Sequence, residues 1–439
     1  MKKNSNIIII GGGLSGLSTA YFLSKKNISF KLYEKESDFG GLCRTVKLNG
    51  YSFDYTGHLL HTSQPRIEKL LKKLLGSNLK KIERKSWIYS SNVFTPYPFQ
   101  LNTYRLPLEV KKECLIGYVQ AYYKRINSRK KLKNINFKDW VKNYLGDGFG
   151  RHFMYPYNNK LWAEDVSNLS TSWLKSYVPK ADLYNVIAGA LTEPKLTTGY
   201  NAFFYYPKRG GIQSLINSFR DNIEDNIHLN SNVSQVNFRK KELIINNQKQ
   251  NYEYLINSAP LKYFILNILE DAPQKIKNAA KMLKYCTVLN INFGVNRKIT
   301  DKHWIYFPED KYIFYRAGFG SNFSEYMAPR NSTAIYTEVS MKKDIEISEN
   351  KKYAHRILKD LLKAGILNKK DKIQAAAPLK LRPAYVIYDR YRDESVQEIL
   401  YFLKKKDIFC VGRYGKWEYS AMEHAIMDGY NTSRLFSHI

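Results

Sequence analysis

One stretch near the start of the chain limits the choice of fold more than any other: "NIIIIGGGLSGLSTAYFLSKKNISFKLYEKE". Residues 7–10 are apolar without interruption, which is typical of a parallel strand that is covered on both faces. Residues 14–24 follow as a helix, and residues 29–33 follow as a second strand. This order predicts a βαβ unit and therefore an α/β fold that is built on a parallel sheet.

The turn between the first strand and the helix has the spacing G-x-G-x-x-G, which Gly11, Gly13 and Gly16 provide. In dinucleotide-binding folds the first glycine permits the tight turn, the second lets a pyrophosphate approach the backbone, and the third lets helix and strand pack closely. Glu34 ends the second strand, where a carboxylate accepts hydrogen bonds from both ribose hydroxyls. We therefore predict a dinucleotide site with the pyrophosphate at the helix N-terminus.

A second pair of glycines follows Glu34 in the segment "KESDFGGLCRT". Gly40 and Gly41 let the chain run close to a ligand, and Arg44 is able to contact a phosphate. A glycine pair followed by arginine at this place resembles the FAD-binding amine-oxidase superfamily, whereas folds that bind only NAD do not need this loop. The predicted dinucleotide is therefore FAD.

The end of the chain repeats the pattern of strand, glycine turn and helix in "DIFCVGRYGKWEYSAMEHAI". A further buried strand with small residues at its end, "YEYLINSAPL", lies between the two. We expect both strands to rejoin the sheet that the first residues begin. The helix after Arg413 would then point its N-terminus at the flavin.

The middle of the chain predicts two further regions. Residues 107–192 are broadly helical with a break at "YPYNNKLWAEDV", and residues 50–62 resemble a hairpin beside the flavin ring. The segment "IHLNSNVSQVNFRKKELIIN" and residues 285–340 alternate as antiparallel strands do. The predicted fold class is α/β: a discontinuous Rossmann-type FAD domain with a helical insert and an antiparallel β-sheet domain. The predicted boundaries are 1–98, 201–283 and 393–439 for the FAD domain, 99–200 for the helical substrate domain and 284–392 for the sheet substrate domain.

The chain has 70 Lys and Arg against 39 Asp and Glu, which gives a net charge of +31. Such a charge predicts attraction to phosphates and a weak association with an anionic membrane surface, without a specific nucleic-acid partner. The other explanation, a general abundance of Lys, Asn, Ile and Tyr, stays open. The 4 cysteines lack metal-ligand or disulfide spacing, and no stretch reaches the roughly 20 apolar residues of a membrane span. We expect a cytoplasmic protein without a metal, and the oligomeric state stays open.

Five segments together resemble the UDP-galactopyranose mutases, flavoenzymes that interconvert the pyranose and furanose forms of nucleotide sugars. They are "TPYPFQLN", "YNNKLWA", "YNAFFYYPKRGG", "FYRAGFGSNFS" and "GRYGKWEYSAMEH". The resemblance spans nearly the whole chain and is closest to the eukaryotic-type branch, although "TGHLLHT" is more similar to the bacterial branch. It implies an isomerase of the FAD-dependent amine-oxidase and protoporphyrinogen-oxidase-like superfamily, with a role in making galactofuranose for cell-surface polysaccharides.

The resemblance also implies the site residues. Arg316 and His58 would be catalytic, Arg316 at the diphosphate and His58 at the reactive edge of the flavin. The substrate-binding residues would be Phe99, Gln100, Asn158, Trp162, Tyr177, Asn201, Arg316, Tyr385 and Tyr419. The cofactor-binding residues would be Gly11, Gly13, Leu14, Ser15, Gly16, Glu34, Lys35, Gly41, Leu42, Arg44, Gly57, His58, Val233, Gly412, Arg413, Tyr419 and Met422.

Three of these assignments have specific arguments. Phe99 would contact the face of the base. An unpaired Arg316 in an aromatic strand would be costly to bury, and a diphosphate partner would remove that cost. Tyr385 and Tyr388 are three apart on a strand, so they face opposite sides and only one would reach the substrate. The chain departs from the family at Tyr177, where a second arginine is usual and where Lys175 is a candidate substitute.

In the family, N5 of the reduced flavin attacks the anomeric carbon and expels the nucleotide diphosphate, and the sugar then recloses in the other ring size. No electrons are transferred overall. A second hypothesis is an FAD-dependent oxidase or desaturase of the amine-oxidase or protoporphyrinogen-oxidase type, which needs an apolar substrate tunnel instead of a phosphate clamp. A third is a catalytically silent protein that FAD stabilises.

Overall fold

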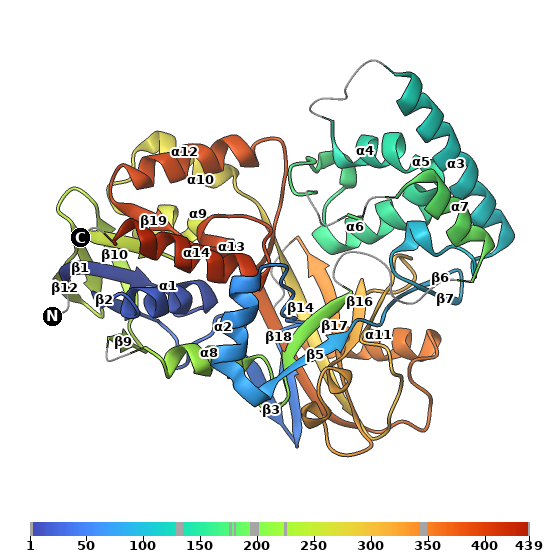
Figure 1. Ribbon diagram of the computed structural model, residues 1–439, viewed down its shortest axis with the longest axis horizontal. Helices are drawn as coiled ribbons and strands as arrows, with labels where there is room; N and C mark the ends of the chain where they lie inside the picture. Colours follow the sequence, from blue (N-terminus) through green and yellow to red (C-terminus); the bar gives the residue numbers. More distant parts are fainter. Residues whose placement is uncertain are drawn as a thin grey trace.

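The computed structural model describes residues 3–128, 135–174, 178–179, 181–193, 202–223, 226–342 and 349–437. Figure 1 shows a sheet flanked by helices on the left, a helical region at the upper right, and a long sheet between and below them. Both ends of the chain lie on the left-hand region (Figure 1). The first and last residues therefore belong to the same part of the molecule.

The left-hand region is built on a five-stranded parallel sheet with the order β19-β13-β1-β2-β9. Its strands are β1 (Lys3–Ile10), β2 (Ile28–Tyr33), β9 (Ile227–His228), β13 (Tyr254–Asn257) and β19 (Ile408–Cys410). Within β1, Ile9 lies opposite Leu32 on one side and opposite Ile256 on the other. The sheet joins strands from the start, middle and end of the chain, which confirms the predicted discontinuous α/β fold.

The apolar run of β1 is explained by helices on both faces of the sheet. Ile7 and Ile9 pack into one apolar cluster, and Ile8 and Ile10 pack into another. The first cluster includes α1 (Leu14–Ser24), α2 (Pro65–Leu75), α8 (Gln213–Arg220) and α14 (Met422–Leu435), and the second includes α9 (Leu261–Tyr263), α10 (Gln274–Met282) and α12 (Arg392–Lys404). Alternate residues of a strand point to opposite faces, so a strand covered twice has no polar position.

Helices α1 and α14 cross at backbone contact. A Cβ atom on Gly429 of α14 would lie 2.6 Å from the backbone nitrogen of Thr19 in α1. Ser18 of α1 donates a hydrogen bond from Oγ to the carbonyl oxygen of Ala425 at 3.2 Å. The last helix is therefore fixed against the first one.

The second large sheet has seven strands in the order β18-β14-β17-β16-β15-β6-β7. Its strands are β6 (Ser86–Ser90), β7 (Val93–Pro96), β14 (Tyr285–Val295), β15 (Trp304–Tyr306), β16 (Arg316–Phe319), β17 (Thr333–Met341) and β18 (Ile373–Val386). All neighbours are antiparallel except β15 and β6. Helix α11 (Asn350–Lys363) packs on this sheet through Ile357 and Leu361. Strands β6 and β7 join it although they lie within the segment 1–98 that we assign to the FAD domain.

The helical region contains α3 (Leu108–Asn127), α4 (Phe137–Tyr144), α5 (Gly146–Phe149), α6 (Tyr155–Trp162) and α7 (Leu183–Leu191). The predicted break at "YPYNNKLWAEDV" is wrong, because most of this segment is helix α6. Pro156 lies in the first turn of α6, where a missing backbone N–H does no harm. The chain leaves the helix only at Ala163, which has a left-handed φ of 47°.

Two further local predictions need correction. The hairpin consists of β3 (Thr45–Leu48) and β4 (Tyr51–Asp54), so it begins before residue 50, and residues 55–62 follow it as irregular chain. Strands β10 (Val233–Asn237) and β11 (Glu242–Ile245) are antiparallel as predicted, with β12 (Gln248–Asn251) as the third strand. The preceding strand β9 instead joins the parallel sheet. A short two-stranded sheet pairs β5 (Leu79–Glu83) with β8 (Phe203–Pro207).

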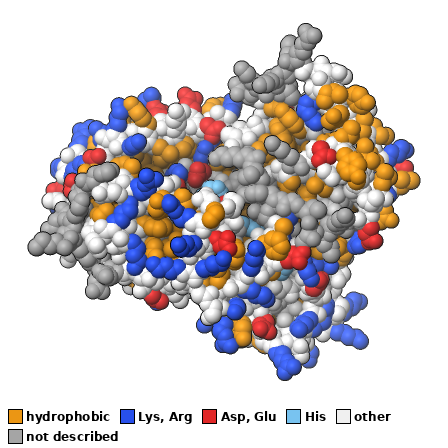
Figure 2. Space-filling view, viewed as in Figure 1, with side chains coloured by type: hydrophobic (Ala, Val, Ile, Leu, Met, Phe, Trp, Pro, Cys, Tyr) orange, Lys and Arg blue, Asp and Glu red, His pale blue; other side chains and the backbone are white. Residues whose placement is uncertain are grey.

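Basic side chains are spread over the visible face rather than gathered in one patch (Figure 2). Apolar side chains gather at the upper right, over the helical region (Figure 2). The exposed apolar residues of α3 and α7 are Leu108, Ile116, Tyr123, Ile126, Tyr184, Ile187 and Leu191. Among the residues described, no helix combines the length and the apolar character that crossing a membrane requires. Association with a membrane surface stays a prediction.

Gly429→Ala should destabilise the protein, because the new methyl group would force α14 away from α1. We expect a loss of about 1–3 kcal/mol in the free energy of unfolding, measured as a lower midpoint of urea unfolding. Gly320→Ala is the matched control, because a Cβ atom there would meet nothing closer than 3.8 Å. Equal midpoints for the two variants would contradict the close crossing.

Candidate functional site

A cavity of about 1200 Å³ lies where the three regions meet. Its wall includes residues that follow β1, β2, β13 and β19, together with residues of α6, β15, β16 and β18. Ligands of open α/β sheets bind outside the carboxyl ends of the strands, so the cavity stands where the fold predicts a site.

The glycine turn at the cavity has the geometry that its spacing predicts. Gly11 turns the chain at a φ of 96°. A Cβ atom on Gly16 would lie 1.9 Å from the carbonyl oxygen of Gly11, so only glycine lets helix and strand approach. A Cβ atom on Gly13 would meet only the Cα of Gly41, at 3.9 Å, and would otherwise point into open space. Gly13 therefore leaves room for a ligand, and Gly16 leaves room for the protein.

Glu34 is held at the end of β2 by backbone N–H groups. Gly12 donates to its Oε2 at 2.6 Å, and Glu36 donates to its Oε1 at 3.0 Å. Each carboxylate oxygen has a second lone pair. The side chain is buried at the cavity wall, so those lone pairs are placed to accept hydroxyl groups of a ribose.

The second glycine pair folds back onto the first turn. Gly40 donates from its backbone N–H to the carbonyl oxygen of Gly12 at 2.9 Å. Gly40 and Gly41 have φ angles of 120° and 57°, which side chains rarely permit. Arg44 donates from Nε to the carbonyl oxygen of Gly41 at 2.9 Å, and its guanidinium group lies 5.1 Å from the ring of Tyr55. Two backbone turns and one cation therefore border the same part of the cavity.

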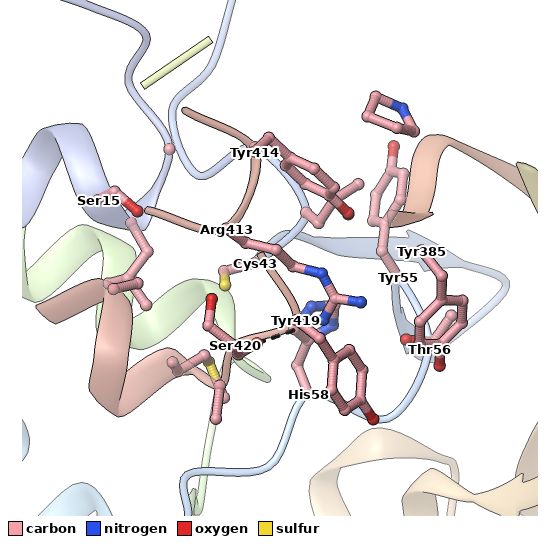
Figure 3. A pocket seen from close by; sticks show the side chains of 18 of the residues that line it. Ser15, Cys43, Tyr55, Thr56, His58, Tyr385, Arg413, Tyr414, Tyr419 and Ser420 are labelled. Carbon is pink, nitrogen blue, oxygen red and sulfur yellow. Dashed lines mark hydrogen bonds between the residues drawn. The ribbon is translucent and has the colours of Figure 1, made fainter. Parts of the chain in front are cut away.

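The segment after β19 forms a further part of the wall. Gly412 has a φ of 77° and donates from its backbone N–H to Asp428 of α14 at 2.9 Å. Arg413 follows, and its guanidinium group lies 5.0 Å from the rings of both Tyr385 and Tyr419 (Figure 3). Nη1 of Arg413 also donates to the carbonyl oxygen of Ser420 at 3.3 Å.

His58 stands beside Arg413 in the wall (Figure 3). Burial, and then the positive charge of Arg413, lowers the pKa of His58 to about 4. Burial likewise lowers the pKa of His61 to about 4, and Nδ1 of His61 lies 3.1 Å from the carbonyl oxygen of Phe203. Both imidazoles are therefore neutral at physiological pH, and neither supplies a positive charge.

Several buried polar atoms of the wall fit a polar ligand. Within the described part of the chain, Nδ1 of His58, Nε1 of Trp417 and Oγ of Ser420 are buried without a hydrogen-bond partner. Such atoms are costly unless a ligand or water binds them. Together with the space at Gly13, they show that the residues present fit a bound dinucleotide with a polar ring.

Arg316 does not stand unpaired in its strand. Its Nε donates to Glu338 at 3.0 Å, and its Nη2 donates to both carboxylate oxygens at 2.7 Å. Glu338 lies opposite it on β17 and is completely buried. The premise that Arg316 would be unpaired without a diphosphate is therefore wrong, because Glu338 supplies the counter-charge. Contact of Arg316 with a diphosphate stays a prediction. Arg316 still lines the cavity.

Tyrosine hydroxyls surround this ion pair. Tyr385 and Tyr419 line the cavity, and burial raises the pKa of both. They are therefore neutral hydrogen-bond donors. Tyr388 lies behind them, with its hydroxyl accepting the backbone N–H of Tyr419 at 2.7 Å. Tyr388 lies two residues beyond the end of β18 at Val386, so its predicted place on the strand is wrong. Of the two tyrosines, Tyr385 lines the cavity and Tyr388 does not.

Two predicted substrate residues lie behind the wall instead of in it. Phe99 is completely buried, and its ring stacks on that of Phe153 at 5.0 Å. Trp162 is also completely buried, packs edge-on against Tyr385 and Tyr419, and donates to Asn158 at 3.2 Å. Phe153, Tyr385 and Tyr419 line the cavity in their place. The direct contact that we predict for Phe99 with the base is not supported by this arrangement.

The other predicted residues are placed as follows. Gln100 lines the cavity and donates from Nε2 to the carbonyl oxygen of Pro179 at 2.9 Å. The predicted cofactor residues in the wall are Gly11, Gly13, Leu14, Ser15, Glu34, Lys35, Gly41, Leu42, Arg44, Gly57, His58, Val233, Arg413, Tyr419 and Met422. Gly412 packs on Ser15 immediately behind it. Tyr177, Lys175 and Asn201 lie outside the described residues.

The structure adds residues that the sequence reasoning missed. Trp304 and Tyr306 of β15, Tyr157 of α6, and Tyr97 all line the cavity. Trp304 and Tyr306 are two apart on a strand, and this alternation is the signal that would have placed them on one face. Tyr157 stands next to Asn158, inside the segment that we predicted as a helix break.

Comparison with known proteins supports the fold. Residues 9–74 match the family described as NAD(P)-binding Rossmann-like domain. The structure superposes on a crystal structure of reduced UDP-galactopyranose mutase with a TM-score of 0.92 and 24% identity, covering 99% of this chain and 96% of that one. The chain therefore has the fold of that enzyme, as predicted.

Two curated relatives match part of the sequence. The UDP-galactopyranose mutase of Mycoplasma pneumoniae is 24% identical over 205 residues, which cover 43% of this chain and 50% of the relative. The dTDP-fucopyranose mutase of Escherichia coli is 22% identical over 193 residues, which cover 39% of this chain and 45% of the relative. The chain thus spans about half the length of the curated relatives it matches.

Gly13→Val should leave the protein folded and remove its dinucleotide, because the new side chain would enter the space that Gly13 leaves open. Gly16→Val should instead disturb the fold, since its Cβ atom would overlap the backbone of Gly11. Flavin absorbance of the purified proteins and their thermal midpoints separate the two effects. A flavin-loaded Gly13→Val protein would show that the pyrophosphate does not pass over Gly13.

Proposed function

We propose that the protein is a flavin-dependent nucleotide-sugar mutase, which exchanges the pyranose and furanose forms of a sugar without net oxidation. One observation carries the proposal: a single cavity joins a dinucleotide cradle to a wall of arginine and tyrosine donors. The mutase fold and the two mutase relatives support it. The sugar and the base are not specified by this arrangement.

We expect FAD as the cofactor, with the reduced form active. Glu34 would bind the ribose, the backbone of Gly13 to Ser15 and Arg44 would bind the pyrophosphate, and Met422 at the start of α14 would meet the flavin ring. Bound there, reduced FAD would supply a nucleophilic nitrogen for the anomeric carbon. His58 would pack neutral against the ring.

Arg316 would meet the diphosphate of the substrate. Nε and Nη2 of Arg316 both donate to the carboxylate of Glu338. Nη1 of Arg316 therefore lies on the other edge of the guanidinium group, away from that carboxylate. Tyr385 and Tyr419 would add neutral donors beside it. These fixed donors would stabilise the negative charge that the diphosphate gains as it leaves. Because Glu338 neutralises Arg316, donor geometry would contribute more than net charge.

The helical region would close the site over the sugar. Tyr157 and Asn158 of α6 line the cavity opposite Arg316. The side-chain amide of Asn158 is fixed by a donation to Met154 at 2.8 Å and by the hydrogen bond from Trp162. A rigid wall here would keep the freed diphosphate beside the opened sugar, which favours its return. The domain boundaries, the cytoplasmic location and the weak membrane association stay predictions.

The proposal is tested with a panel of nucleotide sugars and dithionite-reduced protein. We expect at least one sugar to be converted into an isomer of the same mass, with no consumption of reductant during turnover. The readout is chromatographic separation of the two isomers. An oxidase would behave differently, because an amine or polyene substrate would bleach the oxidised flavin. Bleaching by such a substrate, with no isomer from any sugar, would reject the mutase.

A second test separates the ligand role of Arg316 from its structural role. Arg316→Ala leaves the buried carboxylate of Glu338 without its cation, which should cost about 3–5 kcal/mol of stability. Exchanging both residues for methionine should restore most of the stability, because two neutral side chains replace the pair. Turnover should stay about 100- to 1000-fold below wild type in both variants.

The measurements are urea unfolding midpoints and steady-state turnover on the best sugar of the panel. Flavin content serves as the control in every variant, since the ion pair lies on the sheet of β16 and β17 and away from the glycine turn. Recovery of turnover in the double variant would mean that Arg316 serves only the fold.

A further inference from the structure

Lys160 of α6 reaches out of the helical region into the turn between β15 and β16. Its ammonium nitrogen lies within hydrogen-bond distance of four backbone carbonyl oxygens, those of Phe307 at 2.8 Å, Glu309 at 3.1 Å, Tyr312 at 2.7 Å and Phe314 at 2.7 Å. An ammonium group has three protons, so four acceptors share them. The turn is therefore arranged around a cation that another part of the chain supplies.

The turn has few regular hydrogen bonds of its own. Tyr312 donates its backbone N–H to the carbonyl oxygen of Glu309 at 3.2 Å, and Ile313 donates to Asp360 of α11 at 2.7 Å. Buried carbonyl groups need hydrogen-bond partners. The ammonium nitrogen of Lys160 is a shared partner for four carbonyl groups of the turn. Without it, the carbonyls of Phe307, Tyr312 and Phe314 would need other partners, whereas that of Glu309 would keep the N–H of Tyr312.

Both sides of this contact carry residues of the cavity. On α6, Tyr157 and Asn158 line the cavity within one helical turn of Lys160. At the two ends of the turn, Tyr306 of β15 and Arg316 of β16 line it as well. The ammonium group thus joins two walls that come from distant segments of the chain.

We propose that Lys160 is a positioning residue for the substrate pocket: by binding the carbonyl groups of residues 307–314, its ammonium group fixes Tyr157 and Asn158 at a set distance from Tyr306 and Arg316. The proposal rests on the proposed function for the identity of the ligand. The fastening of the two walls can be measured without any ligand.

The surroundings of the ammonium group shift the pKa of Lys160. Burial lowers the pKa of Lys160 to about 7, and Asp310, Asp360 and Glu309 oppose this shift. Other charged groups around the turn are Lys311, Arg356 and Lys363, and α11 also carries Lys351, Lys352, Lys359 and His355. An exposed lysine titrates near 10.4. If the turn opens and releases Lys160 to water, opening takes up a proton at any pH between these values.

The sign of the pH dependence follows from this difference. The open state binds more protons than the closed state between pH 7 and pH 10, so opening becomes harder as the pH rises, by up to about tenfold per pH unit. Hydrogen-exchange mass spectrometry of residues 307–314, corrected for intrinsic exchange, should show protection that increases over this range. Exchange of residues 307–314 that is as slow in Lys160→Met as in the wild-type holoenzyme overturns the fastening role.

Variants test the consequence for the pocket. Lys160→Met keeps the length of the side chain and removes its donors, and we expect the KM for the best nucleotide sugar to rise about 10- to 100-fold with a smaller change in kcat. Lys160→Arg should restore part of the affinity. The control is Lys26→Met, because Lys26 donates to the carbonyl oxygen of Ser433 at 3.0 Å, at the end of α14, and does not line the cavity.

The outcomes separate this proposal from the proposed function. Faster exchange of residues 307–314 in Lys160→Met with a raised KM supports the positioning role, and an unchanged KM overturns it. If no sugar is turned over, the proposed function fails, and the exchange experiment still decides whether Lys160 fastens the walls. If Lys160→Met does not fold, Lys160→Gln, which keeps two N–H donors on a shorter side chain, takes its place in the same exchange comparison.

Discussion

The parallel pairing of β1 with β2 and β13 is the constraint on which the site depends. Parallel strands end at the same edge of a sheet, so the glycine turn after β1, Glu34 after β2 and the segment after β13 arrive together. Ser258, which follows β13, donates from Oγ to the carbonyl oxygens of Ile10 and Gly11 at 2.8 and 3.0 Å. The turn that would hold a pyrophosphate is thus supported by a strand from the middle of the chain. The last strand adds Gly412 and Arg413 to the same edge.

The electrostatics of the cavity depend on the pair between Arg316 and Glu338. A buried pair of this kind is a weak source of stability, but its geometry fixes the direction of the guanidinium group. The pair is neutral as a whole, so it attracts a dianionic ligand less than a lone arginine would. Other cations of the wall, among them Arg44, Arg84 and Arg413, together with the net charge of +31, would supply the attraction for such a ligand.

Local patterns were predicted from the sequence more accurately than contacts between distant residues. The helix at residues 14–24 and the close packing of Gly16 on the backbone of Gly11 follow from neighbouring residues, and the structure has both as predicted. Glu338 was not predicted as a partner of Arg316, because strand register decides that they face each other. The helix of residues 155–162 lies in a segment that was predicted as a break, and its proline, Pro156, is in the first turn, where it is compatible with a helix.

The resemblance of the motifs predicted which segments lie near the cavity. It did not predict which of their residues line the cavity and which are buried behind the lining residues. Phe99 and Trp162 are completely buried behind Phe153, Tyr385 and Tyr419. Apolar packing between such layers is non-directional, so it does not set the distance between walls from separate segments to a fraction of an ångström. Hydrogen bonds from one atom to several carbonyl groups are directional and do so. Between the helical region and the sheet, Ser340 of β17 donates from Oγ to the carbonyl oxygen of Leu161 at 2.7 Å, and Lys160 adds four contacts from one atom. If these contacts set the spacing of the walls, residues that never touch the ligand would affect its affinity.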